Sequence, residues 1–315
     1  MRQAQPSQVV SIGECMVELA RGSDGRFGLA FGGDTFNTAL YMARSGARVA
    51  YATRLGLDPY SCAIVALAES EGIATHLMQR ADGRMPGLYL IETTAGGERT
   101  FHYWRDRSPA RELFDGPESA TVADAMRAAQ LVYLSGITLS LYSAAALDRF
   151  GAAIEAARAA GVRIAMDGNY RPRGWGGDLP RAQRVMARFW RLADVALPTF
   201  DDEAMLWGDA TPGETIARLA ALGPKEIVVK QGEQGAIVFA GQVPCHVPIP
   251  QRVAAIDTSA AGDSFNGAYL AARLAGIEPE VASLDGHRLA GVVVQHRGAI
   301  APADATTPVI VKRGS

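Results

Sequence analysis

The 315-residue chain contains only three cysteines, and they lie far apart in the sequence at Cys15, Cys62 and Cys245. No Cys-x-x-Cys motif is present, which excludes the common zinc and dithiol redox motifs and favours a reducing compartment. The chain also lacks any run of eighteen apolar residues, and Met1 to Val10 lack the apolar centre of a signal peptide. We therefore expect a cytoplasmic protein that does not associate with a membrane.

The chain also lacks an excess of charge of either sign. It has 31 basic and 33 acidic residues, for a formal net charge of −2. A nucleic-acid partner would favour a basic excess, so we expect none. No Gly-x-Gly-x-x-Gly motif follows the first apolar strand, which argues against a dehydrogenase, and no Walker A motif occurs anywhere.

What the chain does contain is a regular alternation of short apolar runs and helical patterns, with 48% hydrophobic residues. The strand-like runs are 9–13, 49–53, 131–135, 163–167, 195–197 and 226–229, and the main helical patterns are 37–45, 61–71, 143–160, 181–192, 214–221, 262–275 and 281–296. This alternation predicts an α/β fold, with a mostly parallel sheet in a three-layer α/β/α core. We expect a single domain over residues 1–315, with ligands beyond the carboxyl ends of the strands.

Two segments break the alternation, at about residues 14–35 and 86–106. The first contains a strand-like piece and a glycine-rich turn within 16–30, and the second contains strand-like runs at 88–92 and 100–104 around a turn at 94–97. Neither segment has a helix that would return it to the main sheet. We expect them to form a small β-sheet lid, inserted in the core, that closes over a substrate and excludes water.

The most informative string is Asp257 to Gly267, which reads D-T-S-A-A-G-D-S-F-N-G. Small residues let main-chain N–H groups approach an anion, and the following helix adds the positive end of its dipole. The backbone amides of Ala260, Ala261 and Gly262 would then stabilise a transferring phosphoryl group, with Asp263 as the base. The alternative for Ala-Gly-Asp alone is an ordinary helix start.

This string closely resembles the second signature of the PfkB, or ribokinase-like, carbohydrate kinases, Asp-Thr-x-Gly-Ala-Gly-Asp, with Ala260 in place of the first glycine. The resemblance extends from Val10 to about Ala301. The string G-G-D-T-F-N at residues 32–37 matches the first signature, except that Thr35 stands where Gly, Ala or Pro is preferred. The resemblance implies that this loop binds sugar hydroxyls through Gly32, Gly33, Asp34 and Asn37.

Two further segments are similar to the nucleotide side of that family. Lys230 begins the string K-Q-G-E-Q-G, in which Gly232 and Gly235 allow a tight turn near ATP, although a hairpin loop alone would look the same. Thr199 and Asp202 occupy the family's Asn-x-x-Glu positions near Mg²⁺ and phosphate. Asp202 would act through water, and the alternative is a helix N-cap followed by acids of the first turn.

Residues of the expected lid narrow the resemblance to the sugar-acid kinases of the family. In that subgroup Tyr89, Tyr103, Arg105 and Arg171 would contact the sugar acid. A carboxylate requires a fixed cation, and arginine offers planar, bidentate donors. The resemblance thus implies a kinase dependent on ATP and magnesium that phosphorylates the 6-hydroxyl of 2-dehydro-3-deoxy-D-gluconate in an Entner–Doudoroff-type route, with that hydroxyl against Asp263.

Alternatives stay open at this stage. Either arginine could pair with a structural acid such as Asp106 or Asp167, or contact ATP, and the two tyrosines could be core aromatics. A fructokinase or another sugar kinase is the nearest alternative function, and a non-catalytic sugar-binding regulatory protein is an alternative of another class. The family resemblance also leads us to expect a homo-oligomer formed through the lid, and it leaves a monovalent-cation site open.

Overall fold

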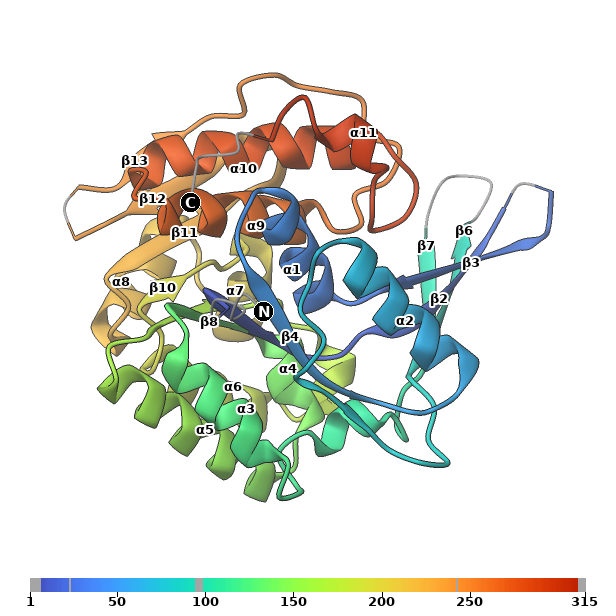
Figure 1. Cartoon of the computed structure of the whole chain (residues 1–315). Helices are drawn as coiled ribbons and strands as arrows, with labels where there is room; N and C mark the ends of the chain where they lie inside the picture. Colours follow the sequence, from blue (N-terminus) through green and yellow to red (C-terminus); the bar gives the residue numbers. More distant parts are fainter. Residues whose placement is uncertain (1–6, 23, 94–98, 242, 311–315) are drawn as a thin grey trace, which may run out of the picture.

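The computed structural model describes residues 7–22, 24–93, 99–241 and 243–310, and these form two sheets (Figure 1). The larger sheet has nine strands in the order β13-β12-β11-β10-β9-β8-β1-β4-β5. All neighbours from β11 to β5 pair in parallel, and β12 and β13 are antiparallel. The strands are β1 Val9–Ile12, β4 Val49–Leu55, β5 Met78–Arg80, β8 Leu131–Ser135, β9 Arg163–Asp167, β10 Val195–Ala196, β11 Glu226–Lys230, β12 Ala236–Phe239 and β13 Cys245–Val247. The predicted, mostly parallel α/β core is confirmed.

Helices cover both faces of this sheet (Figure 1). One face carries α1 Asp34–Arg44, α2 Pro59–Ser70, α9 Ala261–Leu274, α10 Pro279–Val293 and the short α11 Ala303–Thr306. The other carries α3 Ser119–Ala128, α4 Gly136–Leu141, α5 Ala144–Ala159, α6 Leu179–Trp190, α7 Phe200–Trp207 and α8 Pro212–Leu222. Short 3-10 helices lie at Pro109–Glu112, Pro172–Trp175 and Gly232–Gln234. None of the described helices is long and apolar enough to cross a membrane.

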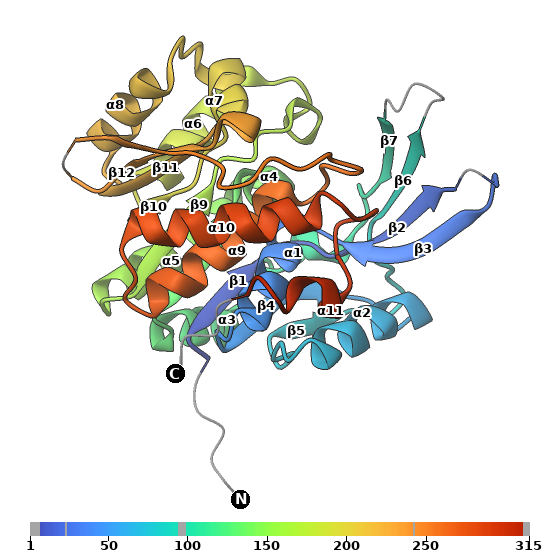
Figure 2. The same ribbon diagram turned by 90° about the horizontal axis from the view of Figure 1, so that it is seen from above.

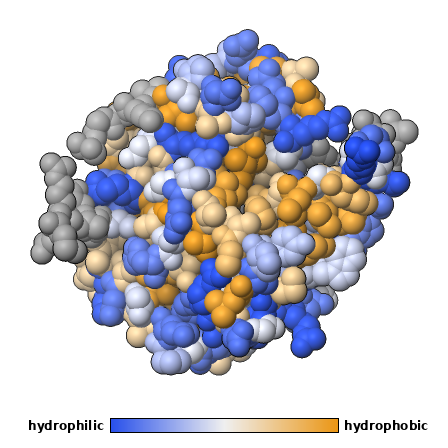
Figure 3. Space-filling model, turned by 45° about the vertical axis from the view of Figure 1, so that its right-hand side comes forward, coloured by the Kyte–Doolittle hydropathy of each residue, from blue (hydrophilic) through white to orange (hydrophobic). Residues whose placement is uncertain are grey.

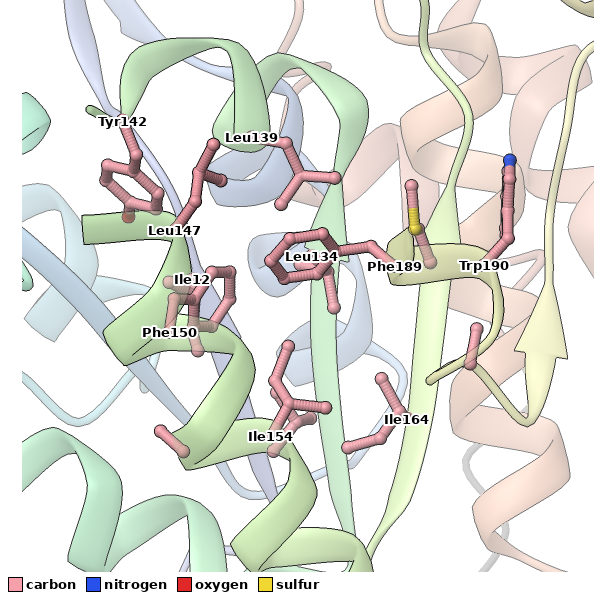
Figure 4. Packing of buried hydrophobic residues seen from close by; sticks show 14 of the residues in the cluster. Ile12, Leu134, Leu139, Tyr142, Leu147, Phe150, Ile154, Ile164, Phe189 and Trp190 are labelled. Carbon is pink, nitrogen blue, oxygen red and sulfur yellow. The ribbon is translucent and has the colours of Figure 1, made fainter. Parts of the chain in front are cut away.

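The strands separate two apolar clusters because successive side chains of a strand point to opposite faces of the sheet. In β1, Val10 and Ile12 enter one cluster and Val9 enters the other. Figure 4 shows part of the first cluster, where Ile12 lies near the rings of Phe150 and Phe189, whose centroids are 5.6 Å apart. Strands buried on both faces are mostly apolar, which is why they could be recognised as short apolar runs.

The smaller sheet has four strands in the order β3-β2-β6-β7 and stands away from the core (Figure 2). Its strands are β2 Met16–Arg21, β3 Phe27–Gly32, β6 Leu88–Thr93 and β7 Arg99–Trp104. Strands β2 and β6 pair in parallel, and the other two pairs are antiparallel. The sequence predicted one strand in 16–30, whereas two are present, and the predicted turn at 94–97 falls in 94–98, outside the described residues.

The surface beside the lid is mixed in character. Figure 3 shows hydrophobic side chains gathered near the centre of this face, with hydrophilic ones around them. On β3 the side chains of Phe27 and Leu29 are 48% and 54% exposed, and Trp104 at the end of β7 is 60% exposed. Part of the apolar surface of the lid is thus not covered by the described residues.

One helix begins earlier than the sequence pattern predicted. The pattern placed a helix start at Asn37, but α1 begins at Asp34, with Gly33 as its N-cap residue. An acid at this position interacts favourably with the positive end of the helix, which offsets the weak helix propensity of Asp-Thr. As a result Asp34 and Asn37 lie in the first turn of one helix, on neighbouring positions of its surface.

Candidate active site

Two cavities adjoin at the carboxyl edge of the large sheet. The first, of about 530 Å³, lies between the lid and the core, and the second, of about 420 Å³, lies between the turn after β11 and helix α10. Both are lined by the same five residues, Thr199, Lys230, Thr258, Ala261 and Gly262. We call them the lid cavity and the outer cavity. A group bound in one can therefore meet a group bound in the other at the start of α9.

The start of α9 is a tight turn with one left-handed residue. Ala260, the N-cap residue, has φ 56° and ψ 16°, a conformation that costs a non-glycine residue about 1–2 kcal/mol. The N–H of Ala261 donates to the carbonyl of Thr258 at 3.3 Å, so this amide is already used within the turn. Gly262 lies in the first helical turn, where N–H groups have no intrahelical acceptor. The side of this turn that faces both cavities thus combines a free amide with the positive end of the helix dipole.

Asp263 lies in this first turn and is half-buried. The Nδ2 group of Asn37 donates to Asp263 Oδ2 at 2.8 Å, and the hydroxyl of Thr38 donates to the Asp263 carbonyl at 3.2 Å. Burial, together with the nearby Asp34 and Asp167 carboxylates, raises the pKa of Asp263 to about 8, although Asn37 opposes the shift. A carboxylate with a pKa near neutrality is suited to accept a proton from a hydroxyl.

A second half-buried acid, Asp34, lies in the first turn of α1. Asn169, directly beyond β9 and with a positive φ of 33°, donates from Nδ2 to Asp34 Oδ2 at 2.8 Å. Burial raises the pKa of Asp34, and a hydrogen bond from Ser135 opposes this shift. Asn169 lines the lid cavity but was not predicted as a site residue. Its position immediately after a parallel strand is the signal that could have identified it.

Lys230, at the end of β11, connects the two cavities. Its Nζ donates to Asp167 Oδ2 at 2.9 Å and to Asn266 Oδ1 at 3.1 Å. Asn266 also donates to Asp167 Oδ2 at 2.6 Å, which completes a buried polar cluster beneath the start of α9. Neither Asp167 nor Asn266 was predicted as a site residue. The sequence pattern placed Asp167 at the end of a strand and Asn266 within a helix.

The base of the lid holds two buried carboxylates that the sequence patterns did not identify. Arg105 donates from Nη2 to Glu14 Oε2, and the hydroxyl of Tyr89 donates to Glu18 Oε2. The two glutamates are 2% and 3% exposed, and all four residues line the lid cavity. Arg105 thus has an acidic partner, as the alternative interpretation of the sequence allowed, but the partner is Glu14 rather than Asp106 or Asp167.

The second arginine is also paired with an acid. Arg171 donates from Nη1 to both oxygens of Asp202, at 2.9 and 3.0 Å. Burial raises the pKa of Asp202 and the arginine opposes that shift. Arg171 lines the lid cavity, together with Tyr103, Gly33 and Asn37. The structure therefore places the predicted metal residue, Asp202, directly against a predicted sugar-acid residue.

Gly32 does not line either cavity among the described residues. A Cβ atom added to it would lie 3.0 Å from the hydroxyl oxygen of Tyr89, so the glycine leaves space for that side chain. Gly32 therefore packs against Tyr89, which lines the lid cavity, and does not line the cavity itself.

The turn after β11 lines the outer cavity. Gly232 and Gly235 have positive φ values of 54° and 93°, and a Cβ at Gly235 would lie 2.4 Å from the Val247 carbonyl oxygen. Phe265 and His287 form another part of the wall, with ring centroids 5.0 Å apart, and were not predicted. The glycine turn gives this cavity one backbone-lined side, and the two rings, inclined at 61° to each other, form part of another.

Comparisons with known proteins agree with this geometry. The sequence profile of the pfkB family carbohydrate kinases matches residues 6–306, and the chain belongs to that family. It is 40% identical over 306 residues to the 2-dehydro-3-deoxygluconokinase of Dickeya dadantii, covering 94% of this chain and 97% of that protein. It is also 40% identical to the 2-dehydro-3-deoxygluconokinase of Escherichia coli strain K12, covering 95% and 98%.

A solved structure supports the fold. The fructokinase of Xylella fastidiosa with bound ATP superimposes with a TM-score of 0.80, covering 96% of this chain and 98% of that one, at 21% identity. The ribokinase-like architecture, with its four-stranded lid, is thereby shown. At this low identity the likeness is one of fold.

Proposed function

We propose that this kinase transfers the γ-phosphoryl group of ATP to the 6-hydroxyl of 2-dehydro-3-deoxy-D-gluconate and forms 2-dehydro-3-deoxy-6-phospho-D-gluconate. The observation that carries the proposal is the pair of cavities that meet at the start of α9, with two arginines on the wall of the lid cavity. The 40% identity to 2-dehydro-3-deoxygluconokinases over nearly the full chain supports the choice of substrate.

In this proposal Asp263 accepts the proton of the 6-hydroxyl as the sugar oxygen attacks the γ-phosphorus. The bond between that phosphorus and the oxygen bridging to the β-phosphate breaks, and ADP leaves with the bridging oxygen. Negative charge on the transferring group is stabilised by the N–H of Gly262, by the positive end of the α9 dipole and by the Lys230 ammonium. The Ala261 amide, which the sequence also predicted for this role, is hydrogen-bonded to the Thr258 carbonyl instead. The hydrogen bond from Asn37 holds the Asp263 carboxylate in place for this transfer.

The carboxylate of the sugar acid would lie at the other end of the lid cavity, where Arg105 and Arg171 supply donors. The sugar hydroxyls would bind to the first turn of α1 through Asp34 and Asn37 and to the backbone of the preceding glycines. The hydroxyl of Tyr89 donates a hydrogen bond to Glu18, so the Tyr89 oxygen can accept a hydrogen bond from a substrate hydroxyl. The walls of the lid cavity thus offer hydrogen-bond donors for the carboxylate of the sugar acid and hydrogen-bond acceptors for its hydroxyls.

ATP would occupy the outer cavity, with its triphosphate directed toward Thr199 and Lys230 and its nucleoside near Gly232 and Gly235. Mg²⁺ would be bound mainly by the phosphates and water, since it keeps several water ligands. Asp202 is the protein residue that we propose to contact it through water, which requires its carboxylate to share or release Arg171. No group of three or more His, Cys, Asp or Glu side chains arranged for a metal occurs within the described ranges.

We also propose that two copies of the chain associate through the lid. Phe27 and Leu29 are alternate residues on β3, so they lie on one face of an edge strand, and both are about half exposed. Sedimentation or light scattering would test this, and a monomer at micromolar concentration would reject it. Because the reaction uses ATP, we expect it to occur in the cytoplasm.

A fructokinase is the alternative within the family, and a non-catalytic sugar-binding protein is the alternative outside it. A sugar acid has a carboxylate that the remaining donors of Arg105 and Arg171 can bind, whereas a neutral ketose has no charge for them, and each arginine also pairs with an acid of the protein. A non-catalytic protein gives no reason for an aspartate on the wall of the lid cavity whose pKa is raised to about 8. The arginines therefore favour a sugar acid over a neutral sugar, and Asp263 favours a kinase over a non-catalytic protein.

A coupled assay of ADP formation tests the proposal with a panel of sugar acids, including the gluconate and galactonate epimers, and with neutral ketoses such as fructose. We expect turnover with the 2-keto-3-deoxy acids and at least about 100-fold lower kcat/KM with fructose, as for loss of a charged partner. Arg105→Ala should remove most of this preference. Equal efficiency with fructose would reject the proposed substrate, and no ADP formation with any sugar would reject the kinase activity.

A further inference from the structure

Glu14 lies where the chain passes from the core into the lid. It follows the last residue of β1, Ile12, by two positions and precedes the first residue of β2, Met16, by two. Its side chain is 1% exposed and lines the lid cavity. Arg105, its ion-pair partner, directly follows β7, where the chain leaves the lid again. The ion pair between Glu14 and Arg105 therefore joins the point where the chain enters the lid to the point where it leaves the lid.

The backbone around Glu14 leaves this residue little freedom to move. A Cβ on Gly33 would lie only 2.0 Å from the Glu14 carbonyl oxygen, so the start of α1 packs directly on its main chain. A Cβ on Gly87 would lie 2.8 Å from Glu14 Oε1, so the beginning of the second lid segment packs on its carboxylate. Glycines at both places allow the close approach. The carboxylate is therefore fixed relative to the core and to the lid base together.

The buried charge of Glu14 is balanced mainly by Arg105. Among the described residues, Glu14 is the hydrogen-bond partner of the Arg105 guanidinium, and both Glu14 Oε1 and Arg105 Nε are buried without a partner. Removing one member of such a pair leaves an uncompensated charge in a dry site. Arginine has five N–H donors in a planar fork, so a contact through Nη2 leaves other donors for a second carboxylate.

The second arginine of the cavity is held differently. The Arg171 side chain is 55% exposed and its partner Asp202 lies on α7, whereas the Arg105 side chain is 18% exposed. The ring of Tyr103 lies 5.9 Å from the Arg105 guanidinium carbon and limits its motion on another side. Both arginines are held by hydrogen bonds, and the Arg105 pair is the more buried of the two.

We propose that Glu14 is the positioning residue that holds Arg105 as a fixed receptor for the carboxylate of the substrate, and that this pair sets the preference of the site for sugar acids. The inference rests on the proposed function, in which Arg105 binds that carboxylate. Because the guanidinium is already oriented, binding the acid does not require its ordering, which lowers the KM for acids without changing the phosphoryl transfer step.

A double-mutant cycle tests this role, with Glu14→Gln, Arg105→Ala and the combined variant. Glu14→Gln keeps the shape of the side chain and removes its charge. We expect it to raise KM for 2-dehydro-3-deoxygluconate about tenfold, the typical effect of one charge-assisted hydrogen bond. The values of kcat, KM for ATP and KM for any neutral ketose should stay within about twofold, because these do not depend on the orientation of Arg105. In the Arg105→Ala background, Glu14→Gln should not raise KM further.

Glu18→Gln is the matched control, since it removes a second buried carboxylate from the same wall without touching Arg105. Its effect on KM should add to that of Arg105→Ala. Additive effects of Glu14→Gln and Arg105→Ala, or a lower KM in Glu14→Gln, would overturn the positioning role. If Arg105→Ala leaves KM for the acid unchanged, the proposed substrate contact has failed instead.

Thermal unfolding separates folding defects from the binding effect. Arg105→Ala strands a buried carboxylate and should lower the melting temperature, and adding Glu14→Gln should restore part of it. If Glu14→Gln does not fold, Glu14→Asp keeps the charge and retracts it by one methylene. A rise in KM for the acid with unchanged kcat would then support the inference, and an unchanged KM would overturn it.

Discussion

Replacing Asp263 with asparagine should make the protein more stable and nearly inactive, and both effects can be reasoned from the site. Asparagine keeps the shape of the side chain and can still accept the hydrogen bond from Asn37 Nδ2, which is 2.8 Å away in the wild type. What it loses is the titrating charge. Burial and the neighbouring Asp34 and Asp167 raise the pKa of Asp263 from 3.8 to about 8.

The sign of the stability effect follows from this raised pKa. Between about pH 4 and pH 8 the folded state binds a proton that the unfolded state has released, so this carboxyl group makes folding less favourable as pH rises. A shift of about four units corresponds to roughly 5–6 kcal/mol above pH 8. Asp263 and Asp34 share this repulsion, and the interior relaxes around the charge. We therefore expect a net gain of about 1–2 kcal/mol for Asp263→Asn at pH 8, or a few degrees in Tm.

The assay is thermal unfolding of both proteins at pH 5 and pH 8.5, combined with coupled turnover. The Tm advantage of Asp263→Asn should grow with pH, and its kcat should fall by about 10²–10⁴ because the proton acceptor is gone. In the wild type, kcat/KM should rise with pH up to about 8, as Asp263 loses its proton. Asp201→Asn, at an exposed acid of α7, is the control and should change neither quantity. A pH-independent Tm difference, or turnover within tenfold of wild type, would refute the reasoning.

Three further substitutions test other parts of the structure. Lys230→Met leaves the buried Asp167 without its cation, so thermal melting should show a lower Tm. ATP titration should show a KM for ATP raised at least about tenfold. Wild-type values for both would contradict the roles of Lys230 as partner of Asp167 and as ATP contact. Ala260→Gly relieves the left-handed strain and should raise the unfolding free energy by up to about 1 kcal/mol in urea, whereas a loss would argue against strain. Arg218→Met removes the partner of Glu203, and burial raises the pKa of Glu203 to about 7. The free energy of unfolding should fall by about 3 kcal/mol at pH 8 and by less at pH 5, where Glu203 is protonated. Equal losses at both pH values would contradict this.

The parts of the fold that the sequence predicted correctly are those with a strong local pattern. The strands β1, β8, β9 and β11 are buried on both faces and have mainly apolar centres, so they were recognised. Two short edge strands, β5 and β13, were missed, because three residues with mixed burial leave no clear period. The hairpin partner β3 was read as a turn, since it is glycine-containing and largely exposed.

The candidate site divides in a similar way. The small-residue string that ends at Asp263 and the glycine turn after Lys230 are local features. The string lies where the two cavities meet, and the glycine turn lines the outer cavity. Glu14 and Glu18 gave no such signal, because a single glutamate in a strand-like segment is usually exposed. Only the packing of the lid base shows that these two acids are buried.

The sequence by itself determined the family, the α/β core and the chemistry of the loop before α9, since each depends on residues that are neighbours in the chain. Only the tertiary structure decided which charged groups meet. Asn37 contacts Asp263 across 226 positions and Arg105 contacts Glu14 across 91. Such pairs depend on how the lid folds back onto the core and on close backbone contacts at glycines, and no local periodicity encodes them.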